Sequence, residues 1–333
     1  MRAALVSLAL FAAAPGASWA KAQAQDVVPG GGRGVATLRV VNDTFAGVDR
    51  WYSSRLELAT TLRIAEGAGG DWQLALRAGQ VLYTSRNIQR LEAPTRDHGF
   101  GAFLYGDLAA FHTRRRGLAV LRLRLGALGD RAFGDPVQDT LHRLLGVRRP
   151  RGWPNQIGTD VGVEVTAGGG GFHPVPLRRW RLVLAGLGLG DAGNLRRRFR
   201  LGAGLAVLRG TTGHVALEAL EPSLLTAQGP CRDARCGGFT AGSVLELRAY
   251  DRFVEADGAP VRPDIEARTA VAAFRLGAVF RWRRVRRCGG VARAGWSLAY
   301  SQVWRQRTFD NVPRQRLHPE WHQWGEFEVR AHW

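Results

Sequence analysis

The feature that most constrains this sequence is the alternation of apolar and polar residues over runs of roughly ten positions. One such run reads Leu121-Arg122-Leu123-Arg124-Leu125, and similar runs recur along most of the chain. Because successive side chains of a strand point to opposite faces, each run makes one apolar face and one charged face. The pattern therefore predicts an all-β fold.

Two all-β architectures can carry such strands. A soluble sandwich would bury the apolar faces, whereas a transmembrane barrel turns them to lipid and fills its interior with polar groups. A signal peptide, runs long enough to cross a bilayer and aromatic residues near strand ends favour the barrel. These aromatic residues are Trp72, Tyr83, Trp180, Trp296 and Trp304. The terminal Trp333, which closes an alternating strand, is typical of the C-terminal signal of bacterial outer-membrane barrels.

An antiparallel barrel of about twelve strands is predicted, with both termini in the periplasm. The strands are expected at 34–43, 51–65, 71–85, 100–113, 117–129, 157–167, 177–189, 196–209, 238–254, 267–284, 290–305 and 321–333. The glycine-rich stretch 168–173 and the long connection 210–237 then lie on the periplasmic side. The loops 44–50, 86–99 and 130–156 face outward, so surface chemistry is expected there.

The first residues are typical of a secreted protein. Arg2 precedes an apolar stretch, and Ala22-Gln23-Ala24 fits a signal-peptidase site. Residues 1–24 are therefore predicted to be a signal peptide, and residues 25–333 a single barrel domain. The alternative, an N-terminal anchor helix, would need a longer apolar core.

Charge and cysteine content agree with this compartment. Lys+Arg is 47 against Asp+Glu 28, a formal charge of +19, and Lys21 is the only lysine. Such a balance calls for an anionic partner, and secretion argues against nucleic acid, which leaves a phosphate-rich membrane surface. Cys231 and Cys236 are close enough to form a local disulfide, leaving Cys288 as a possible free thiol.

The loop 130–156 contains a predicted helix, with Asp135 as its cap, Pro136 in its first turn and Gly146 after its end. Gln138 and His142 share one helical face. A histidine at the outer rim is a candidate general base, although a solvated helix residue is the plainer interpretation. A separate apolar stripe, which could lie against the rim or the lipid, consists of Val137, Leu141, Leu144 and Leu145.

The first outward turn carries oxygen-bearing side chains. Asn42 and Asp43 end one strand, and Ser53 lies near the start of the next. Carboxylate, amide and hydroxyl oxygens are of the type that calcium accepts. The alternative is that these are ordinary turn residues.

Several short motifs, taken in this order, resemble one family over nearly the whole mature chain. The family is that of the outer-membrane lipid A 3'-O-deacylases, the LpxR family. The motifs are Asn42-Asp43, Asp49-Arg50-Trp51-Tyr52-Ser53, Tyr83-Thr84, Asp97-His98-Gly99-Phe100-Gly101-Ala102-Phe103-Leu104-Tyr105, Val137-Gln138-Asp139-Thr140-Leu141-His142 and Gly152-Trp153-Pro154-Asn155-Gln156.

The resemblance implies an enzyme with its active site at the outer-leaflet rim of the barrel. Such enzymes hydrolyse the ester of the 3'-linked acyloxyacyl chain of lipid A and need calcium. By position, His142 would activate the attacking water. Asn42 and Asp43, helped by Ser53, would hold the cation or order the site.

One position departs from the family pattern, which includes a catalytic-site lysine after the third strand. Here that stretch reads Asn87-Ile88-Gln89-Arg90. Arg90 could donate to an oxyanion, but a guanidinium is not a base. Two interpretations follow: the chain acts by a variant route, or it is a silent or passive barrel, such as a porin or an adhesive protein.

Other outer-loop residues are candidates for substrate binding. Arg143, Arg148 and Arg149 flank the predicted helix, and Gln138 lies on the face of His142. Guanidinium groups bind phosphates well, so contact with the lipid A phosphates is one interpretation. The other is a solvated charged rim. A monomer is expected.

Overall fold

The computed structural model describes residues 33–46, 51–67, 69–92, 97–224, 235–256, 259–260, 265–283, 295–311 and 321–333. The predicted signal peptide, residues 1–24, lies outside this range, so its assignment stays a prediction. Within the described residues, no helix is both long and apolar enough to cross a membrane.

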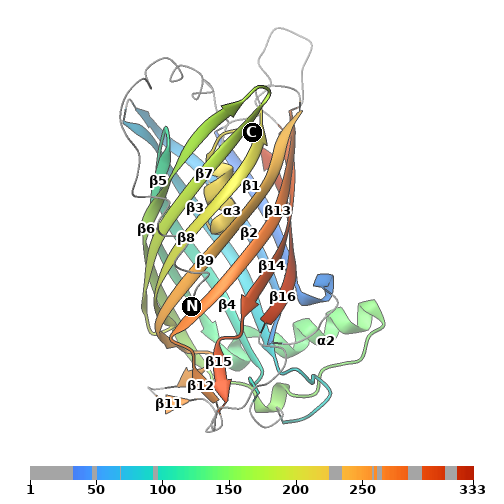
Figure 1. Cartoon of the computed structure of the whole chain (residues 1–333). Coiled ribbons are helices and arrows are strands. Elements are labelled where there is room, and N and C mark those ends of the chain that lie inside the picture. Colours follow the sequence, from blue (N-terminus) through green and yellow to red (C-terminus); the bar gives the residue numbers. More distant parts are fainter. Residues whose placement is uncertain are drawn as a thin grey trace.

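Twelve antiparallel strands close into a single barrel (Figure 1). In chain order they are β1 (Gly34–Asn42), β2 (Trp51–Gly67), β3 (Gly70–Thr84), β4 (Gly101–Arg114), β5 (Gly117–Leu128), β6 (Asp160–Leu177), β7 (Trp180–Gly193), β8 (Arg196–Arg209), β9 (Arg235–Asp251), β13 (Ala270–Arg283), β14 (Gly295–Gln306) and β16 (Trp321–His332). Each strand pairs with its neighbours in this order, and β1 pairs with β16 to close the wall. The predicted fold class and strand number are confirmed.

Four short strands form two small sheets outside the barrel. β10 (Glu255–Ala256) pairs with β11 (Ala259–Pro260), and β12 (Ile265–Ala267) pairs with β15 (Phe309–Asn311). We call the end of the barrel that carries Trp333 the inner end, and the opposite end, where helix α2 (Gly134–Leu145) lies, the outer end (Figure 1).

The apolar faces of the strands point outward, as predicted for a barrel. On β5, Leu121 and Leu125 are 58% and 49% exposed, whereas Arg122 and Arg124 between them are each 4% exposed. Such a surface suits lipid, and the closed hydrogen-bonding ring leaves no strand edge in the hydrocarbon.

Aromatic side chains gather at the inner end. Trp72, Trp180, Trp296 and Trp333 are all exposed there, as in the aromatic girdles of outer-membrane barrels. Tyr83 differs from them, because its hydroxyl accepts a hydrogen bond of 2.9 Å from the buried Arg196 and therefore belongs to the barrel interior.

The glycine-rich stretch was wrongly predicted to be a turn. β6 continues through it to Leu177, and the turn falls at Arg178, whose φ is 52°. Gly168 has a φ of 147°, and a Cβ there would collide with the carbonyl oxygen of Gly188 on the neighbouring strand. Glycine is therefore needed for close strand approach, and the strand does not end.

The connection after β8 enters the barrel, which the sequence did not predict. Its helix α3 (His214–Leu220) lies among β6, β7, β8, β9 and β13 (Figure 1). Leu217 and Leu220 pack into an apolar cluster with Phe111 and Leu208 from the wall. On the other face, Glu218 accepts a hydrogen bond of 2.6 Å from Arg330. The inner half of the lumen is thus filled by a plug.

Cys236 lies on β9 and is disulfide-bonded. Cys231 and Cys288 both fall outside the described residues. The proposed pairing of Cys231 with Cys236 therefore stays a prediction.

Candidate active site at the outer rim

Helix α2 carries the predicted base, and its ends are set by backbone geometry. The chain enters α2 from the 3-10 turn η4 (Gly129–Ala132) through Phe133, whose φ is 55°. Asp135 lies inside the first turn and makes no capping bond, so the predicted cap was wrong. Gly146 ends the helix with a φ of 67°, and its N–H reaches the carbonyl groups of Arg143 and His142.

His142 is held on the buried face of α2 and is only 8% exposed. Its Nδ1 lies 2.6 Å from the carbonyl oxygen of Arg148. Because a carbonyl can only accept a hydrogen bond, Nδ1 must carry the hydrogen, and the lone pair of the neutral ring is on Nε2. The structure therefore orients His142 with Nε2 as the basic atom, and the solvated interpretation of this residue is excluded.

Gln138 lies one turn before His142 and is 3% exposed. Its Oε1 accepts a hydrogen bond of 2.9 Å from Nε1 of Trp153. Trp153 also packs edge-on against Phe100, at the start of β4. Gln138 thus fastens the face of α2 that carries His142 to the loop after the helix and, through it, to the barrel.

An adjacent face of α2 is apolar and exposed. Val137, Leu141, Leu144 and Leu145 are 43%, 38%, 80% and 64% exposed, respectively. Figure 1 shows α2 extending sideways from the outer end of the barrel. These apolar side chains are therefore not packed on the barrel rim.

The segment that departs from the family pattern lies against the loop after α2. The N–H of Arg151 donates to the carbonyl of Ile88 at 2.8 Å, and the amide of Gln89 donates to the carbonyl of Arg149 at 3.0 Å. Arg90 follows directly and its side chain is exposed. The segment that carries the Arg90 guanidinium therefore packs on the backbone of the loop that contains Arg148. The carbonyl of Arg148 is the hydrogen-bond partner of His142.

The basic residues around α2 are exposed. Arg143 and Arg149 both lie against Asp139, and their side chains are 61% and 63% exposed. Hydrogen bonding to Arg149 holds the pKa of the Asp139 carboxyl below its ordinary value and raises the pKa of Arg149. The side chain of Arg148 is also exposed. Two guanidinium groups thus share one carboxylate, which leaves positive charge at this surface.

Asn42 and Asp43 lie at the junction of β1 and the 3-10 turn η3 (Asp43–Ala46). Asn42 Oδ1 accepts a hydrogen bond of 2.7 Å from the N–H of Thr44, which fixes the turn. Asp43 is 1% exposed, and its Oδ2 lies 3.9 Å from Nε2 of His322. His322 belongs to β16, and sequence reasoning missed it.

Ser53 lies at a β-bulge, since the pairing of β2 with β3 shifts register between Tyr52 and Ser54. The side chains of residues 51–53 are outside the described part of the structure, so the proposed role of Ser53 stays a prediction. Among the described residues, no group of three or more His, Cys, Asp or Glu side chains has metal-binding geometry.

The motif residues Asp97 and His98 have a structural role. Asp97 accepts hydrogen bonds from the N–H groups of Arg86 and His98, at 2.8 and 2.9 Å. His98 is 3% exposed, and burial lowers its pKa, so it is neutral near neutral pH. This turn supports the start of β4, on which Gly134 of α2 rests.

His142 and Asp43 lie at the same end of the barrel. Asp43 follows the last residue of β1 at the outer end, and helix α2, which carries His142, lies at that end (Figure 1). Strands β2 and β3 lie between β1 and β4. β1 leads to Asp43, and the first residue of α2, Gly134, packs against Ala102 of β4. At about 4.8 Å between neighbouring strands, the two anchor points are about 15 Å apart along the wall. The arrangement is an open rim with a base on one side and oxygen donors on the other.

Comparisons with known proteins agree with this geometry. The family model described as "Outer membrane protein LpxR" matches residues 5–333. The chain belongs to the LpxR family. The predicted resemblance is therefore confirmed. The predicted location of the protein in the bacterial outer membrane is also confirmed.

The structure is also similar to that of LpxR from Salmonella typhimurium. The TM-score is 0.70 at 17% identity, covering 90% of this chain and 100% of that one. The β-domain of the Bordetella autotransporter BrkA covers 91% of this chain and 99% of its own, at 10% identity and a TM-score of 0.44. No curated protein sequence matches the chain.

The contacts of His142 predict its tautomer in this LpxR family member. In 15N-histidine spectra at mildly alkaline pH, His142 should be protonated on Nδ1 and unprotonated on Nε2. His214 is a matched reference inside the same protein, because its Nε2 lies 3.1 Å from the carbonyl of Gly117 and should carry the hydrogen. Signals are assigned with His142→Gln and His214→Gln. An Nε2-protonated His142 would contradict the proposed base.

Proposed function

We propose that this protein hydrolyses the ester of the 3'-linked acyloxyacyl chain of lipid A at the outer leaflet of the outer membrane. Membership of the LpxR family supports a lipid A deacylase. The observation that carries the proposal is the buried His142, whose Nδ1 is bound to a backbone carbonyl and whose Nε2 is left as a base at the rim.

In this mechanism Nε2 of His142 takes a proton from a water molecule, and the water oxygen attacks the ester carbonyl. The hydrogen bond from Nδ1 to the Arg148 carbonyl orients the ring and stabilises the imidazolium that forms. The bond between the carbonyl carbon and the sugar oxygen then breaks, and Nε2 returns the proton to the departing sugar oxygen. Gln138 and Trp153 act as positioning residues, because they hold the helix that carries the base.

The position of α2 supports a substrate that stays in the membrane. Its exposed apolar stripe can rest among acyl chains, while Arg143, Arg148 and Arg149 lie at headgroup level. The scissile ester of lipid A lies near this boundary, so the substrate need not be extracted. We further propose that these arginines, with Arg90, contact the phosphates and sugars of the substrate. Gln138, which was expected to bind substrate, is only 3% exposed and serves instead as a positioning residue.

A calcium ion, if bound, would polarise the ester carbonyl and stabilise the oxyanion. Asp43 and Asn42 fit as its ligands, because they offer a buried carboxylate and an amide oxygen on neighbouring residues. Ser53 is the third proposed group. Calcium takes six to eight oxygens, so water, backbone carbonyls and substrate would supply the rest.

The missing lysine supports a second candidate function, a silent barrel kept for binding or structure. Arg90 can replace a lysine as a hydrogen-bond donor but cannot act as a base. Since His142 already provides the base in our proposal, a donor is sufficient at this position. A porin is the weaker alternative, because α3 fills the inner half of the lumen.

The proposal predicts a change in lipid A. Cells that express the protein should yield lipid A lighter by one acyloxyacyl chain in mass spectra, whereas His142→Ala should leave the mass unchanged. Loss of a general base typically slows such reactions by about 10²–10⁴-fold. His173→Ala, on β6 towards the inner end, is the matched control and should behave as wild type. An unchanged mass with a folded wild-type barrel would favour the silent alternative.

A second prediction concerns the cation. Chelation should abolish deacylation by the purified protein, and added calcium should restore it. Asp43→Asn should need at least about tenfold more calcium for half-maximal activity, because one anionic ligand is lost. Asp160→Asn is the control, since Asp160 lies on the same rim but pairs with Arg252 at 2.9 Å. Activity that persists in chelator, or an equal shift in both variants, would contradict this role.

A further inference from the structure

Two arginines face the membrane at the inner end of the barrel wall. On β8, Leu205 is 46% exposed to the outside, whereas Leu208 is buried in the apolar cluster around the plug. Because side chains alternate along a strand, the exposed Arg209 points outward with Leu205. Arg235, the first residue of β9, is exposed on the same side as Phe239, which is 64% exposed. Both guanidinium groups are therefore presented to the bilayer and not to the lumen.

The outward face of β8 shows at which depth Arg209 lies. This face begins with Arg197 at the outer end and finishes with Arg209 at the inner end. The residues between them on this face are all apolar, namely Phe199, Leu201, Ala203, Leu205 and Val207. The two arginines are about 41 Å apart along the strand, or about 31 Å across the membrane at a strand tilt of about 40°. The hydrocarbon core is about 30 Å thick, so Arg209 lies at the level of the inner headgroups.

Tryptophans adjoin Arg235 on the neighbouring strands. Arg235 pairs directly with Trp282 of β13, and Trp282 pairs in turn with Trp296 of β14. Trp296 is 50% exposed on the outside of the wall. Indole rings favour the interface between hydrocarbon and headgroups, because one part of the ring is apolar and the N–H is polar. Arg235 therefore lies at the same depth as the aromatic girdle.

Arg209 belongs to the same row of side chains. It pairs with Gly237, two residues along β9 from Arg235, so the two arginines are diagonal neighbours with Cα atoms about 7–8 Å apart. On its other side, the register of β7 against β8 brings Trp180 opposite Arg209. We call this row the inner wall patch; it consists of Trp180, Arg209, Arg235, Trp282 and Trp296.

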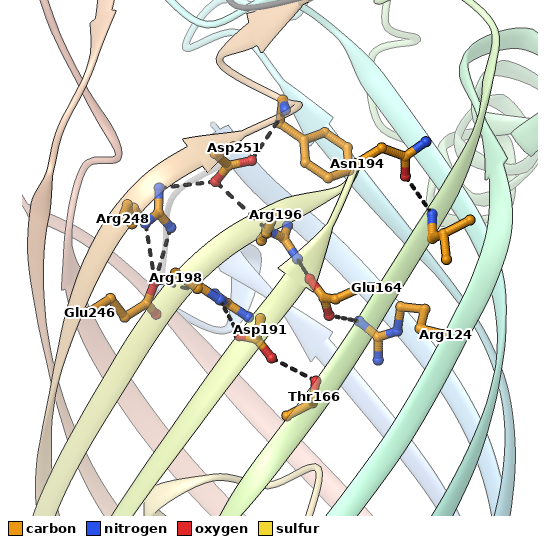
Figure 2. Close-up of polar contacts among 12 residues, drawn as sticks. Arg124, Glu164, Thr166, Asp191, Asn194, Arg196, Arg198, Glu246, Arg248 and Asp251 are labelled. Atoms are coloured by element: carbon orange, nitrogen blue, oxygen red, sulfur yellow. Dashed lines mark hydrogen bonds and ion pairs between the residues drawn. The ribbon is translucent and has the colours of Figure 1, made fainter.

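Carboxylates balance the arginines of the lumen but not those of the inner wall patch. On the inward face of β8, Arg198 lies 2.6 Å from Asp191 and 3.2 Å from Glu246 (Figure 2). Within the described residues, no ion pair joins Arg209 or Arg235 to a carboxylate. The patch is thus a positively charged strip that borders directly on lipid.

The turn between β6 and β7 adds to this charge. It consists of Arg178 and Arg179, which are both exposed and directly precede Trp180. Such short turns are typical of the periplasmic end of outer-membrane barrels. The inner wall patch therefore meets the inner leaflet of the outer membrane, which consists of glycerophospholipids.

We propose that the inner wall patch binds one anionic glycerophospholipid of the inner leaflet. Arg209 and Arg235 donate paired N–H groups to its phosphate, a geometry that guanidinium groups favour. Trp180 and Trp282 lie against its glycerol and the upper part of its acyl chains, which continue along the apolar wall. A zwitterionic headgroup binds less well, because its ammonium group is repelled by the surrounding arginines. The site goes beyond the proposed deacylase reaction, since His142 lies at the opposite end of the barrel.

The test is native mass spectrometry of the mature barrel, released from micelles that contain equal amounts of phosphatidylglycerol and phosphatidylethanolamine with identical acyl chains. The wild-type barrel should retain one phosphatidylglycerol molecule with a preference of more than about tenfold. Each basic residue near an anionic lipid surface contributes about fivefold to binding. The double variant Arg209→Gln/Arg235→Gln should therefore lose this preference.

The double variant Arg115→Gln/Arg116→Gln is the matched control. It removes the same charge from the β4–β5 turn at the same end, but β6 and β7 separate β5 from β8. That separation is about 14 Å of wall, beyond the Debye length of about 8–10 Å. The control should thus keep the preference for phosphatidylglycerol within about threefold of wild type. Heat-modifiable migration on gels verifies that each variant is folded.

Three results would overturn the proposal. These are a wild-type barrel without a preference for phosphatidylglycerol, an equal loss in both folded variants, and a protein dimer in place of the bound lipid. The last result would mean that a second copy of the chain covers the inner wall patch. Because the measurement needs no turnover, failure of the deacylase proposal would leave it unaffected.

Discussion

Ion pairing inside the lumen is the interaction on which the rest of this structure depends. The alternating strands send their leucines to the lipid and their arginines inward, so closing the barrel confines a large positive charge. Asp191 and Glu246 make closure possible because each is shared by three guanidinium groups. Breaking one partner of such a network usually costs several kcal/mol. The plug contributes to the same network through Glu218 and Glu221, and it therefore becomes part of the packed interior of the inner half of the barrel.

A rigid, filled barrel moves the chemistry to its rim. α2 is fastened to the wall by the contact of Gln138 with Trp153, and this contact lets one face bury His142 while the adjacent apolar stripe stays exposed. The pair of Asn42 and Asp43 is fixed independently, at the seam where β1 meets β16. Base and oxygen donors thus come from separate connections on one stable ring, as expected of an enzyme whose substrate lies beside it.

The strand pattern could be predicted because a side-chain period of two reports directly which face meets lipid. It failed at Gly168, where glycines that allow close strand approach were interpreted as a turn. It also missed α3, since one short apolar segment does not tell whether it lies in solvent or in a lumen. The candidate site was proposed from the motifs around His142 and Asp43. His322 was not, because only closure of the first strand on the last brings it near Asp43.

The central claim is that the protein directs water onto the carbonyl carbon of an acyl ester at the rim. The most direct test is to incubate the purified protein with lipid A in H2 18O and to weigh both products by mass spectrometry. Attack at the carbonyl predicts one 18O atom in the released acyloxyacyl acid and none in the sugar. No released acid from a folded barrel, or 18O found in the sugar hydroxyl, would contradict the account.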